Sequence, residues 1–380
     1  MPHGIAFDQG PGTCRAFLSG AFFAYVCSSN HRESIVRNIT AFSRSLLIGA
    51  WALAVGIAWA ATPAPPPAQQ TIDALSRANA AVVGIQVNAS ADGSSVETLG
   101  RQRQGSGVVI GPDGLILTIG YLMLEAENIQ VVTQDGRTLP AKAVAYDLAT
   151  GFGLLQPLLP LRGVAAVPLG NYRDIEPGTV LMTATGAAGG TEADVAMTQL
   201  VSKRAFSGYW EYFIDAALFT SPPIANHSGA PLFNQKGELV GIGSLFVMDA
   251  MGENRQLPGN MFVPIDLLKP ILAELQRTGS TSLSRRPWLG LNSAEQSGRV
   301  QVVRVSKQSP ALAAGLQAGD VVLAVDGTKV TTLEGFYKKL WDRADPTAEV
   351  QLTVLQGAEI KAITVKPVDR MSTMRKPAGI

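Results

Sequence analysis

The chain has 380 residues, with 46% hydrophobic and 16% charged side chains and a formal net charge of +1. This composition excludes an intrinsically disordered chain, because it supplies enough apolar side chains for a folded core. The near-neutral charge gives no indication of a nucleic-acid partner. The length is sufficient for two or three domains, and the 39 glycines and 23 prolines favour short strands joined by turns.

An apolar segment, residues 46–60, follows the basic residues Arg37 and Arg44 and ends in Ala58-Trp59-Ala60. A run of about 15 residues is shorter than the roughly 20 that a membrane-spanning helix needs. A basic start, a short apolar centre and a small-residue cleavage site are typical of a secretory signal peptide. We therefore expect residues 1–60 to be absent from a mature protein that is periplasmic or secreted.

Two alternatives stay open for this N-terminal region. The apolar segment could be retained as an inner-membrane anchor, and translation could begin near Val36, because residues 1–35 are long for a signal peptide and show no pattern of their own. Both cysteines, Cys14 and Cys27, lie in this region. Since no cluster of Cys, His and acidic residues has metal-ligand spacing, we expect no metal and no cofactor.

The mature chain begins with a proline-rich spacer, residues 61–71, which is typical of a stiff, solvated linker. Residues 72–81 have the pattern of a short amphipathic helix. Strand-like segments separated by turn sequences follow at residues 82–87, 107–110, 115–118, 129–133, 180–184 and 239–242. Regular short strands with such turns predict an all-β barrel or sandwich.

The pattern changes after the predicted barrel. Residues 264–278 carry leucines and isoleucines at helical spacing, which predicts a helix, and the polar residues 279–285 predict a linker. The remaining section mixes strands near residues 300–305, 321–325, 350–355 and 360–365 with helices at residues 310–314 and 333–342.

Several segments, in the same order along the chain, resemble proteases of the HtrA/Deg family. Residues 105–118 resemble the strand pair that leads to the catalytic histidine, 135–144 the hairpin that follows, 227–242 the nucleophile loop with its hairpin, and 260–269 the closing strand and helix. Residues 286–291 and 309–327 are similar to the PDZ domain of that family. The resemblance covers about residues 75–370.

The resemblance implies a mainly β fold: a trypsin-like double β-barrel followed by a PDZ domain, which is a small α+β barrel with two helices. The domains expected on this basis are a signal peptide (1–60), a spacer (61–71), a trypsin-like domain (72–278), a linker (279–285), a PDZ domain (286–369) and a C-terminal tail (370–380). Fold alone does not establish function, so the site residues need their own argument.

The protease site implied by the resemblance is incomplete. A serine hydrolase needs a nucleophile, a base that takes its proton and a group that orients the base. Ser228, in Ser-Gly-Ala-Pro-Leu, matches the family nucleophile, but Tyr121 stands at the histidine position and Gly151 at the aspartate position. A phenol, which titrates near pH ~10, is a weak base at neutral pH, and glycine has no side chain. The chain is thus identified as a degenerate, pseudoprotease member of the family.

The histidine count agrees with this without reference to any family. Of the three histidines, two lie in the segment expected to be removed, which leaves His227 beside Ser228. Neighbouring side chains of an extended segment point to opposite sides, so we expect His227 to be poorly placed as a base. Two rescues remain as alternatives: a loop rearrangement that brings His227 to Ser228, and a serine–lysine dyad with Lys203 or Lys142.

The oxyanion hole implied by the resemblance is also altered. Asn226 replaces the glycine two residues before the nucleophile, Ala230 replaces the second glycine after it, and Thr220 replaces an aspartate on the preceding strand. Asparagine tolerates left-handed backbone better than most residues, so the amide of Asn226 could still serve the hole.

The PDZ-like section keeps the residues needed for peptide binding. A PDZ domain adds a peptide strand to an open sheet edge and holds the terminal carboxylate with backbone amides. The resemblance assigns these amides to Leu289, Gly290 and Leu291. Glycine at the centre permits close approach of the ligand.

The helix at residues 333–342 is expected to form the other wall of the peptide groove. Phe336 and Leu340 are the predicted groove residues on this helix. Helical periodicity does not separate Phe336 from Tyr337, and core packing is the alternative role of Leu340 and of Leu333.

Three functions are compatible with these residues. The first is a non-catalytic, periplasmic, HtrA-like protein that binds unfolded segments or C-terminal peptides of envelope proteins as a scaffold, adaptor or holdase. The second is an active serine endopeptidase with a non-standard base, and the third is a regulatory or structural subunit of an active HtrA relative. The resemblance further implies a homo-oligomer, a trimer, and no nucleic-acid partner.

Overall fold

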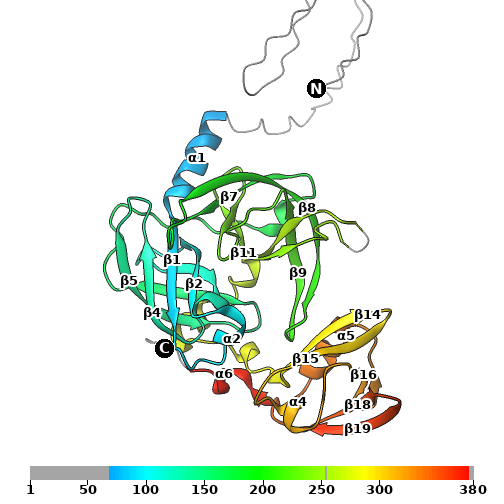
Figure 1. Ribbon diagram of the computed structural model, residues 1–380. Helices are drawn as coiled ribbons and strands as arrows, with labels where there is room; N and C mark the ends of the chain where they lie inside the picture. Colours follow the sequence, from blue (N-terminus) through cyan, green and yellow to red (C-terminus); the bar gives the residue numbers. More distant parts are fainter. Residues whose placement is uncertain (1–67, 253–254, 376–380) are drawn as a thin grey trace, which may run out of the picture. The chain divides into compact units, whose positions relative to one another are not determined.

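The computed structural model describes residues 68–252 and 255–375 of the chain (Figure 1). The predicted signal peptide and most of the predicted spacer lie outside the described residues. Helix α1 (Ala68–Ala80) begins within the segment predicted as spacer. Gln69 Nε2 donates to Asp73 Oδ1 at 2.8 Å in its first turns, a pairing that helical spacing brings together. The spacer therefore ends earlier than the proline pattern predicted.

Two closed antiparallel barrels of six strands each follow α1, which confirms the predicted mainly β fold. The first barrel has the order β1-β2-β3-β6-β5-β4. Its strands are β1 (Val82–Ala89), β2 (Gln102–Val109), β3 (Ile116–Ile119), β4 (Ala126–Val132), β5 (Thr138–Tyr146) and β6 (Phe152–Pro157). Along β5 the buried residues Leu139, Ala143 and Ala145 alternate with exposed ones such as Lys142, the period of a strand with one face inside.

The second barrel has the order β10-β11-β12-β9-β8-β7. Its strands are β7 (Val180–Thr185), β8 (Asp194–Gly208), β9 (Tyr212–Ser221), β10 (Pro231–Phe233), β11 (Leu239–Val247) and β12 (Gly259–Pro264). Strand β8, with 15 residues, turns into β9 through three residues, Tyr209-Trp210-Glu211. We call residues 208–213 the hairpin tip.

The two barrels share one buried apolar cluster, in which Phe152 of β6 and Phe219 of β9 take part. Their close approach depends on Gly84 of β1, because a Cβ atom there would lie only 1.8 Å from the carbonyl oxygen of Ala187, in the loop after β7. This packing brings together loops from both barrels, and the candidate active site is built from those loops.

The C-terminal section forms a sheet of order β14-β15-β16-β18-β19, with β17 paired to β16. Its strands are β13 (Pro287–Trp288), β14 (Leu291–Gln296), β15 (Arg299–Val305), β16 (Val321–Val325), β17 (Thr328–Lys329), β18 (Val350–Gln356), β19 (Glu359–Val365) and β20 (Val368–Asp369). The two predicted helices are α4 (Pro310–Ala313) and α5 (Leu333–Trp341), and they pack on a second buried cluster. Strand β14 is an edge strand of this sheet.

The predicted helix over residues 264–278 is shorter than expected. The structure has a 3-10 turn η3 (Ile265–Leu267) followed by helix α3 (Leu272–Thr278). Pro270 explains the interruption, because proline lacks an amide hydrogen and disfavours helical backbone at the preceding residue, Lys269. The other short elements are α2 (Val96–Leu99), η1 (Gly120–Met123), η2 (Tyr172–Asp174), η4 (Ser282–Ser284) and α6 (Arg370–Thr373). Within the described part of the chain, no helix is both long and apolar enough to cross a membrane.

The polar segment 279–285 is anchored to the first barrel by a buried carboxylate. Asp147 accepts hydrogen bonds from Thr281 Oγ1 and Ser284 Oγ, each at 2.6 Å. It also accepts from the amide of Thr150 at 2.9 Å and from its hydroxyl at 2.6 Å. Polar residues of the predicted linker therefore take part in a buried hydrogen-bond network.

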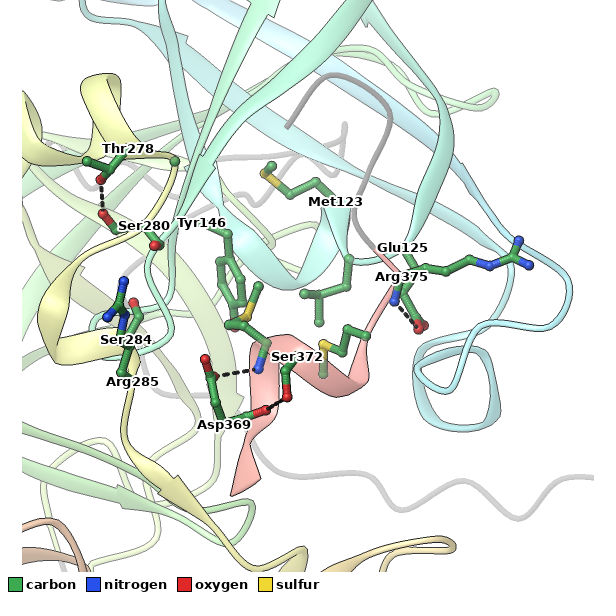
Figure 2. Close-up of a pocket in the computed structure, with 14 residues that line it drawn as sticks. Met123, Glu125, Tyr146, Thr278, Ser280, Ser284, Arg285, Asp369, Ser372 and Arg375 are labelled. Atoms are coloured by element: carbon green, nitrogen blue, oxygen red, sulfur yellow. Dashed lines mark hydrogen bonds between the residues drawn. The ribbon is translucent and has the colours of Figure 1, made fainter. Parts of the chain in front are cut away.

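The segment predicted as a tail also packs against the first barrel, beside a cavity of about 320 Å³ (Figure 2). The amide of Arg375 donates to Glu125 Oε1 at 3.3 Å, and Arg375 Nη1 donates to Ser90 Oγ at 2.8 Å. Within the segment, Ser372 Oγ donates to the Asp369 carbonyl at 2.7 Å. The chain thus returns to the first barrel after the C-terminal sheet.

Candidate active site and peptide-binding site

The structure brings Tyr121 and Ser228 into direct contact. Tyr121 lies on η1, directly after β3 of the first barrel, and Ser228 lies on the turn before β10 of the second. The Tyr121 hydroxyl is 2.6 Å from Ser228 Oγ and 3.0 Å from the carbonyl oxygen of Ser244. The residue at the histidine position therefore occupies the space beside the nucleophile.

This contact supplies no base. The phenol has one proton, which it donates to Ser228 Oγ or to the carbonyl oxygen of Ser244, so Tyr121 is the donor in both contacts. Burial raises the pKa of Tyr121 to about 12, although the hydrogen bond with Ser228 opposes this. A neutral phenol does not take a proton from serine, so the serine hydroxyl is held in its protonated form.

Gly151, at the aspartate position, has backbone geometry that suits glycine. Its φ is +84°, in the region that residues with a side chain rarely adopt. Its carbonyl accepts from the amide of Gly120 at 2.7 Å, and its own amide donates to the carbonyl of Asp147 at 2.8 Å. A Cβ atom on Gly151 would point toward Ile119 and the Tyr212 hydroxyl, at 3.5 and 3.6 Å. The turn has a backbone geometry that suits glycine, but Gly151 has no side chain that could orient a base.

The alternative bases lie elsewhere. His227 Nδ1 is 3.0 Å from the carbonyl of Ala225, and no hydrogen bond joins the described side chains of His227 and Ser228. Burial lowers the pKa of His227, which keeps the imidazole neutral. Lys203 Nζ donates to the carbonyl of Ile175 at 2.7 Å and forms an ion pair with Glu176 at 3.0 Å, and Lys142 is exposed on β5.

The residues predicted to form or replace the oxyanion hole differ in exposure and backbone conformation. Asn226 is exposed, and its φ lies outside the left-handed region that the sequence analysis considered. Gly229 does adopt a φ of +74°, and a Cβ there would lie 2.1 Å from the carbonyl of Ser106. Ala230 is fully buried, and the buried hydroxyl of Thr220 has no hydrogen-bond partner among the described residues.

A cleft of about 800 Å³ adjoins this site. Tyr121, Gly151 and His227 contribute to its wall, together with Trp210 of the hairpin tip and Trp288 of the C-terminal section. The cleft is large enough for a peptide segment.

The predicted carboxylate-binding amides are intact and already paired. The amides of Leu289, Gly290 and Leu291 donate to the side-chain carboxylate of Glu211, at 3.0, 2.8 and 2.7 Å. Gly290 has a φ of +84°, which allows the three amides to converge on one acceptor. Glu211 lies in the second barrel, on the hairpin tip.

The helix residues predicted for the groove have different surroundings. Phe336 and Leu340 are both fully buried in the core of the C-terminal section. Tyr337, which periodicity did not separate from Phe336, reaches the hairpin tip: its hydroxyl donates to the carbonyl of Gly208 at 2.8 Å.

Two functional features escaped the sequence analysis. Glu211 lies in an aromatic turn, Tyr-Trp-Glu-Tyr-Phe, where a single acid has no motif that marks it. Its role depends on contacts with residues about 80 positions away, which local patterns do not reveal. The hydrogen-bond network of Asp147 was missed for the same reason.

Family models match two parts of the chain. The model of the trypsin-like peptidase domain matches residues 105–242, and that of the PDZ domain matches residues 287–366.

Curated relatives carry the name "Probable periplasmic serine endoprotease DegP-like". The one from Halomonas elongata is 29% identical over 293 residues, which cover 73% of this chain and 59% of the relative. The one from Pseudomonas fulva is 30% identical over 285 residues, which cover 70% of this chain and 57% of the relative. The chain thus spans less than two thirds of the length of these relatives.

Among solved structures, a variant of the HtrA-type protease AlgW with a tripeptide matches with a TM-score of 0.50 and 21% sequence identity. The match covers 81% of this chain and 98% of that chain, and at this identity it concerns the fold alone. The chain thus matches a trypsin-like peptidase domain followed by a PDZ domain, and it is similar to relatives named DegP-like.

Proposed function

We propose that this protein is a non-catalytic member of the HtrA/DegP family that binds peptides or unfolded segments through its PDZ domain. The observation that carries the proposal is the 2.6 Å contact of the Tyr121 hydroxyl with Ser228 Oγ. It places a group that is neutral at physiological pH where hydrolysis requires a base. The geometry of Gly151 supports the same conclusion, because no carboxylate is available to orient a base.

Loss of these groups removes most of the catalytic power of a serine protease. Without a working triad, only roughly 10³–10⁴-fold acceleration over water remains, from substrate binding and the oxyanion hole. Here the hole is altered as well, since Asn226 does not have left-handed backbone.

The test is a sensitive proteolysis assay of the mature protein, residues 61–380. We expect no cleavage of casein and no labelling of Ser228 by a fluorophosphonate probe. The matched variant Ser228→Ala should behave like the wild type in both measurements. Labelling of wild-type Ser228, with casein cleavage that disappears in Ser228→Ala, would establish an active endopeptidase with an unusual base.

The PDZ domain supplies the binding activity in this proposal. The three convergent amides of Leu289, Gly290 and Leu291 suit a terminal carboxylate, and β14 is an edge strand that a peptide can extend. We expect peptides with a free apolar C-terminus to bind, and amidated peptides to bind more weakly because they lack the carboxylate. Equal binding of both forms would exclude this pocket.

We propose that the protein acts in the periplasm, because it is similar to relatives that are named as periplasmic. Removal of residues 1–60 should leave a mature N-terminus near Ala61, which N-terminal sequencing of protein from the cell envelope would detect. An N-terminus before residue 46 in a membrane fraction would indicate an anchored protein instead. We also expect a homo-oligomer, a trimer as the family resemblance implies, which sedimentation analysis can test.

A further inference from the structure

The hairpin tip places a carboxylate in the pocket expected to receive a peptide C-terminus. Glu211 Oε1 accepts from the amides of Gly290 and Leu291, and Oε2 accepts from the amide of Leu289. A C-terminal carboxylate presents the same two acceptor oxygens. Glu211 is 9% exposed, so a second carboxylate has no room in this pocket while Glu211 is docked.

The backbone of the hairpin tip also follows the edge of the PDZ sheet. The amide of Ser293, on edge strand β14, donates to the carbonyl of Tyr209 at 2.8 Å. A bound peptide would need such main-chain hydrogen bonds with β14. The tip therefore uses a backbone group of the sheet edge in addition to the carboxylate-binding amides.

An aromatic side chain of the tip fills apolar space in the PDZ domain. Phe213, at the start of β9, is 6% exposed and belongs to the same buried cluster as Leu289, Leu291 and Phe336. The ammonium group of Lys338 on α5 lies 4.9 Å from the centre of its ring. An apolar C-terminal side chain would be recognised by this kind of environment.

Helix α5 completes the enclosure. The Tyr337 hydroxyl accepts a hydrogen bond from the amide of Glu211 at 3.3 Å and donates to the carbonyl of Gly208 at 2.8 Å. The tip is therefore held between β14 and α5, the two elements that border a PDZ groove.

Docking imposes an unfavourable backbone conformation on the tip. Glu211 has a φ of +58°, which is uncommon for a residue with a long side chain. Such conformations persist where surrounding contacts compensate for them, and they often occur at functional positions. Withdrawal of the tip would relieve this conformation and free three amides at once.

From these contacts we infer that the hairpin tip is an internal competing ligand of the PDZ domain, and that Glu211 must leave the Leu289–Gly290–Leu291 amides before a peptide C-terminus can bind. The inference rests on the proposed peptide-binding function. It adds that ligand access is controlled within the chain, because only molecules with a withdrawn tip can accept a peptide. The measured affinity of such a protein is lowered by the fraction of molecules that are open.

The experiment compares mature wild type (residues 61–380) with Glu211→Gln. Glutamine keeps the size of the side chain but replaces one acceptor oxygen with an NH₂ group, which would face amide donors. The matched control is Glu192→Gln, at an exposed carboxylate before β8. The probe is a fluorescein-labelled decapeptide that ends in a free phenylalanine carboxylate, and its amidated form is the ligand control. Binding is followed by fluorescence anisotropy.

We expect Glu211→Gln to bind the free peptide at least about tenfold more tightly than the wild type, and Glu192→Gln to match the wild type. Glu211→Gly, which also relieves the backbone conformation, should bind at least as well as Glu211→Gln. Equal affinities of wild type, Glu211→Gln and Glu211→Gly would overturn the inference and leave the proposed binding function in place.

Hydrogen exchange distinguishes failure of the inference from failure of the proposed function. If no variant binds the peptide, the proposed function is wrong, but the docked tip still has a signature. Exchange at the amides of Leu289, Gly290 and Leu291 should then be slower in the wild type than in Glu211→Gln. Equal exchange rates at these amides would show that Glu211 does not occupy them in solution.

Discussion

The serine site and the carboxylate-binding site of the PDZ domain are both occupied by side chains of the chain itself, with different chemical consequences. At Ser228, the Tyr121 hydroxyl fills the position of the base. At Leu289–Gly290–Leu291, the Glu211 carboxylate fills the position of a ligand. Moving Tyr121 aside would expose a serine without a base, whereas moving Glu211 aside would expose a complete set of donors.

The difference reflects the atoms from which each site is built. A catalytic triad consists of side chains, so its chemistry depends on the residue type at each of its positions. The carboxylate site consists of backbone amides, which persist through most substitutions. A ligand can block this site and a change of backbone conformation can distort it, but substitution of side chains does not remove its amides. The two domains of one chain can therefore diverge in function while both keep their folds.

The largest effect is expected for Gly290→Val. At a φ of +84°, a Cβ atom would lie 2.3 Å from Ser309 Cβ, so the loop must shift and its amides diverge. We expect a loss of roughly 3 kcal/mol of unfolding free energy and no measurable peptide binding. Thermal unfolding and anisotropy check this. Gly357→Val is the control, because it combines a similar φ of +63° with open space around the Cβ position; a similar loss of binding there would refute the clash argument.

A similar loss of stability, but with peptide binding unaffected, is expected for Asp147→Ala, at the turn that carries Gly151. The change leaves the buried donors of Thr150, Thr281 and Ser284 without an acceptor. We expect the free energy of unfolding to fall by about 3 kcal/mol, which is at the lower end of the range for loss of a buried, hydrogen-bonded carboxylate. Peptide binding should be retained. Denaturant unfolding measures it, and the exposed Asp194→Ala should be close to neutral. A neutral Asp147→Ala would mean that this network does not stabilise the turn.

Peptide binding by the wild type should strengthen as pH rises from 5 to 8, by several-fold. Burial raises the pKa of Glu211 to about 7, although the amides and Arg370 oppose this. Glu211 therefore binds a proton more tightly in the docked tip than in the withdrawn tip, where its pKa is that of a free glutamate. Protonation stabilises the docked state by its full amount below about pH 4.5, and this stabilisation is lost as the pH rises toward 7. The free tip should therefore become more populated across this range.

Other titratable groups near Glu211 keep their charge over the same pH range. Burial raises the pKa of Tyr337, so its phenol stays neutral. The peptide carboxylate is ionised above pH 5. Affinity measured against pH should be flat in Glu211→Gln; the same slope in both proteins would assign the titration to another group.

The smallest effect is expected for attempts to restore catalysis. Tyr121→His should not produce casein cleavage, because nothing orients the imidazole. Tyr121→His combined with Gly151→Asp should also fail, since the side chain at residue 151 would start from a strained φ and point toward Ile119 and Tyr212. Tyr121→Phe, which frees the Ser228 hydroxyl without adding a base, is the control. Cleavage by the double variant above that of Tyr121→Phe would show that the scaffold still supports a triad.

Much of this molecule could be predicted from its sequence. The strand-like segments at residues 82–87 and 180–184 correspond to β1 and β7 of the structure. Gly290, which was predicted to permit close approach of a ligand, has a φ of +84°. Helix boundaries were predicted less accurately. The leucine pattern predicted one helix over residues 264–278, because it continues on both sides of Pro270, where the structure interrupts the helix.

The sequence by itself determined the mainly β fold, the presence of Ser228 and the absence of a histidine and an aspartate at the expected positions. The fold follows from residue types and local spacing, and the positions expected for the histidine and the aspartate follow from the resemblance to HtrA proteases. Only the tertiary structure decided which side chain contacts Ser228 and which carboxylate accepts from the amide of Leu291. The Tyr121–Ser228 contact joins residues 107 positions apart, and the Glu211–Leu291 contact joins residues 80 positions apart. These contacts form because the barrels and the C-terminal sheet pack together through many weak apolar contacts. No local sequence pattern specifies which two distant residues this packing brings into contact.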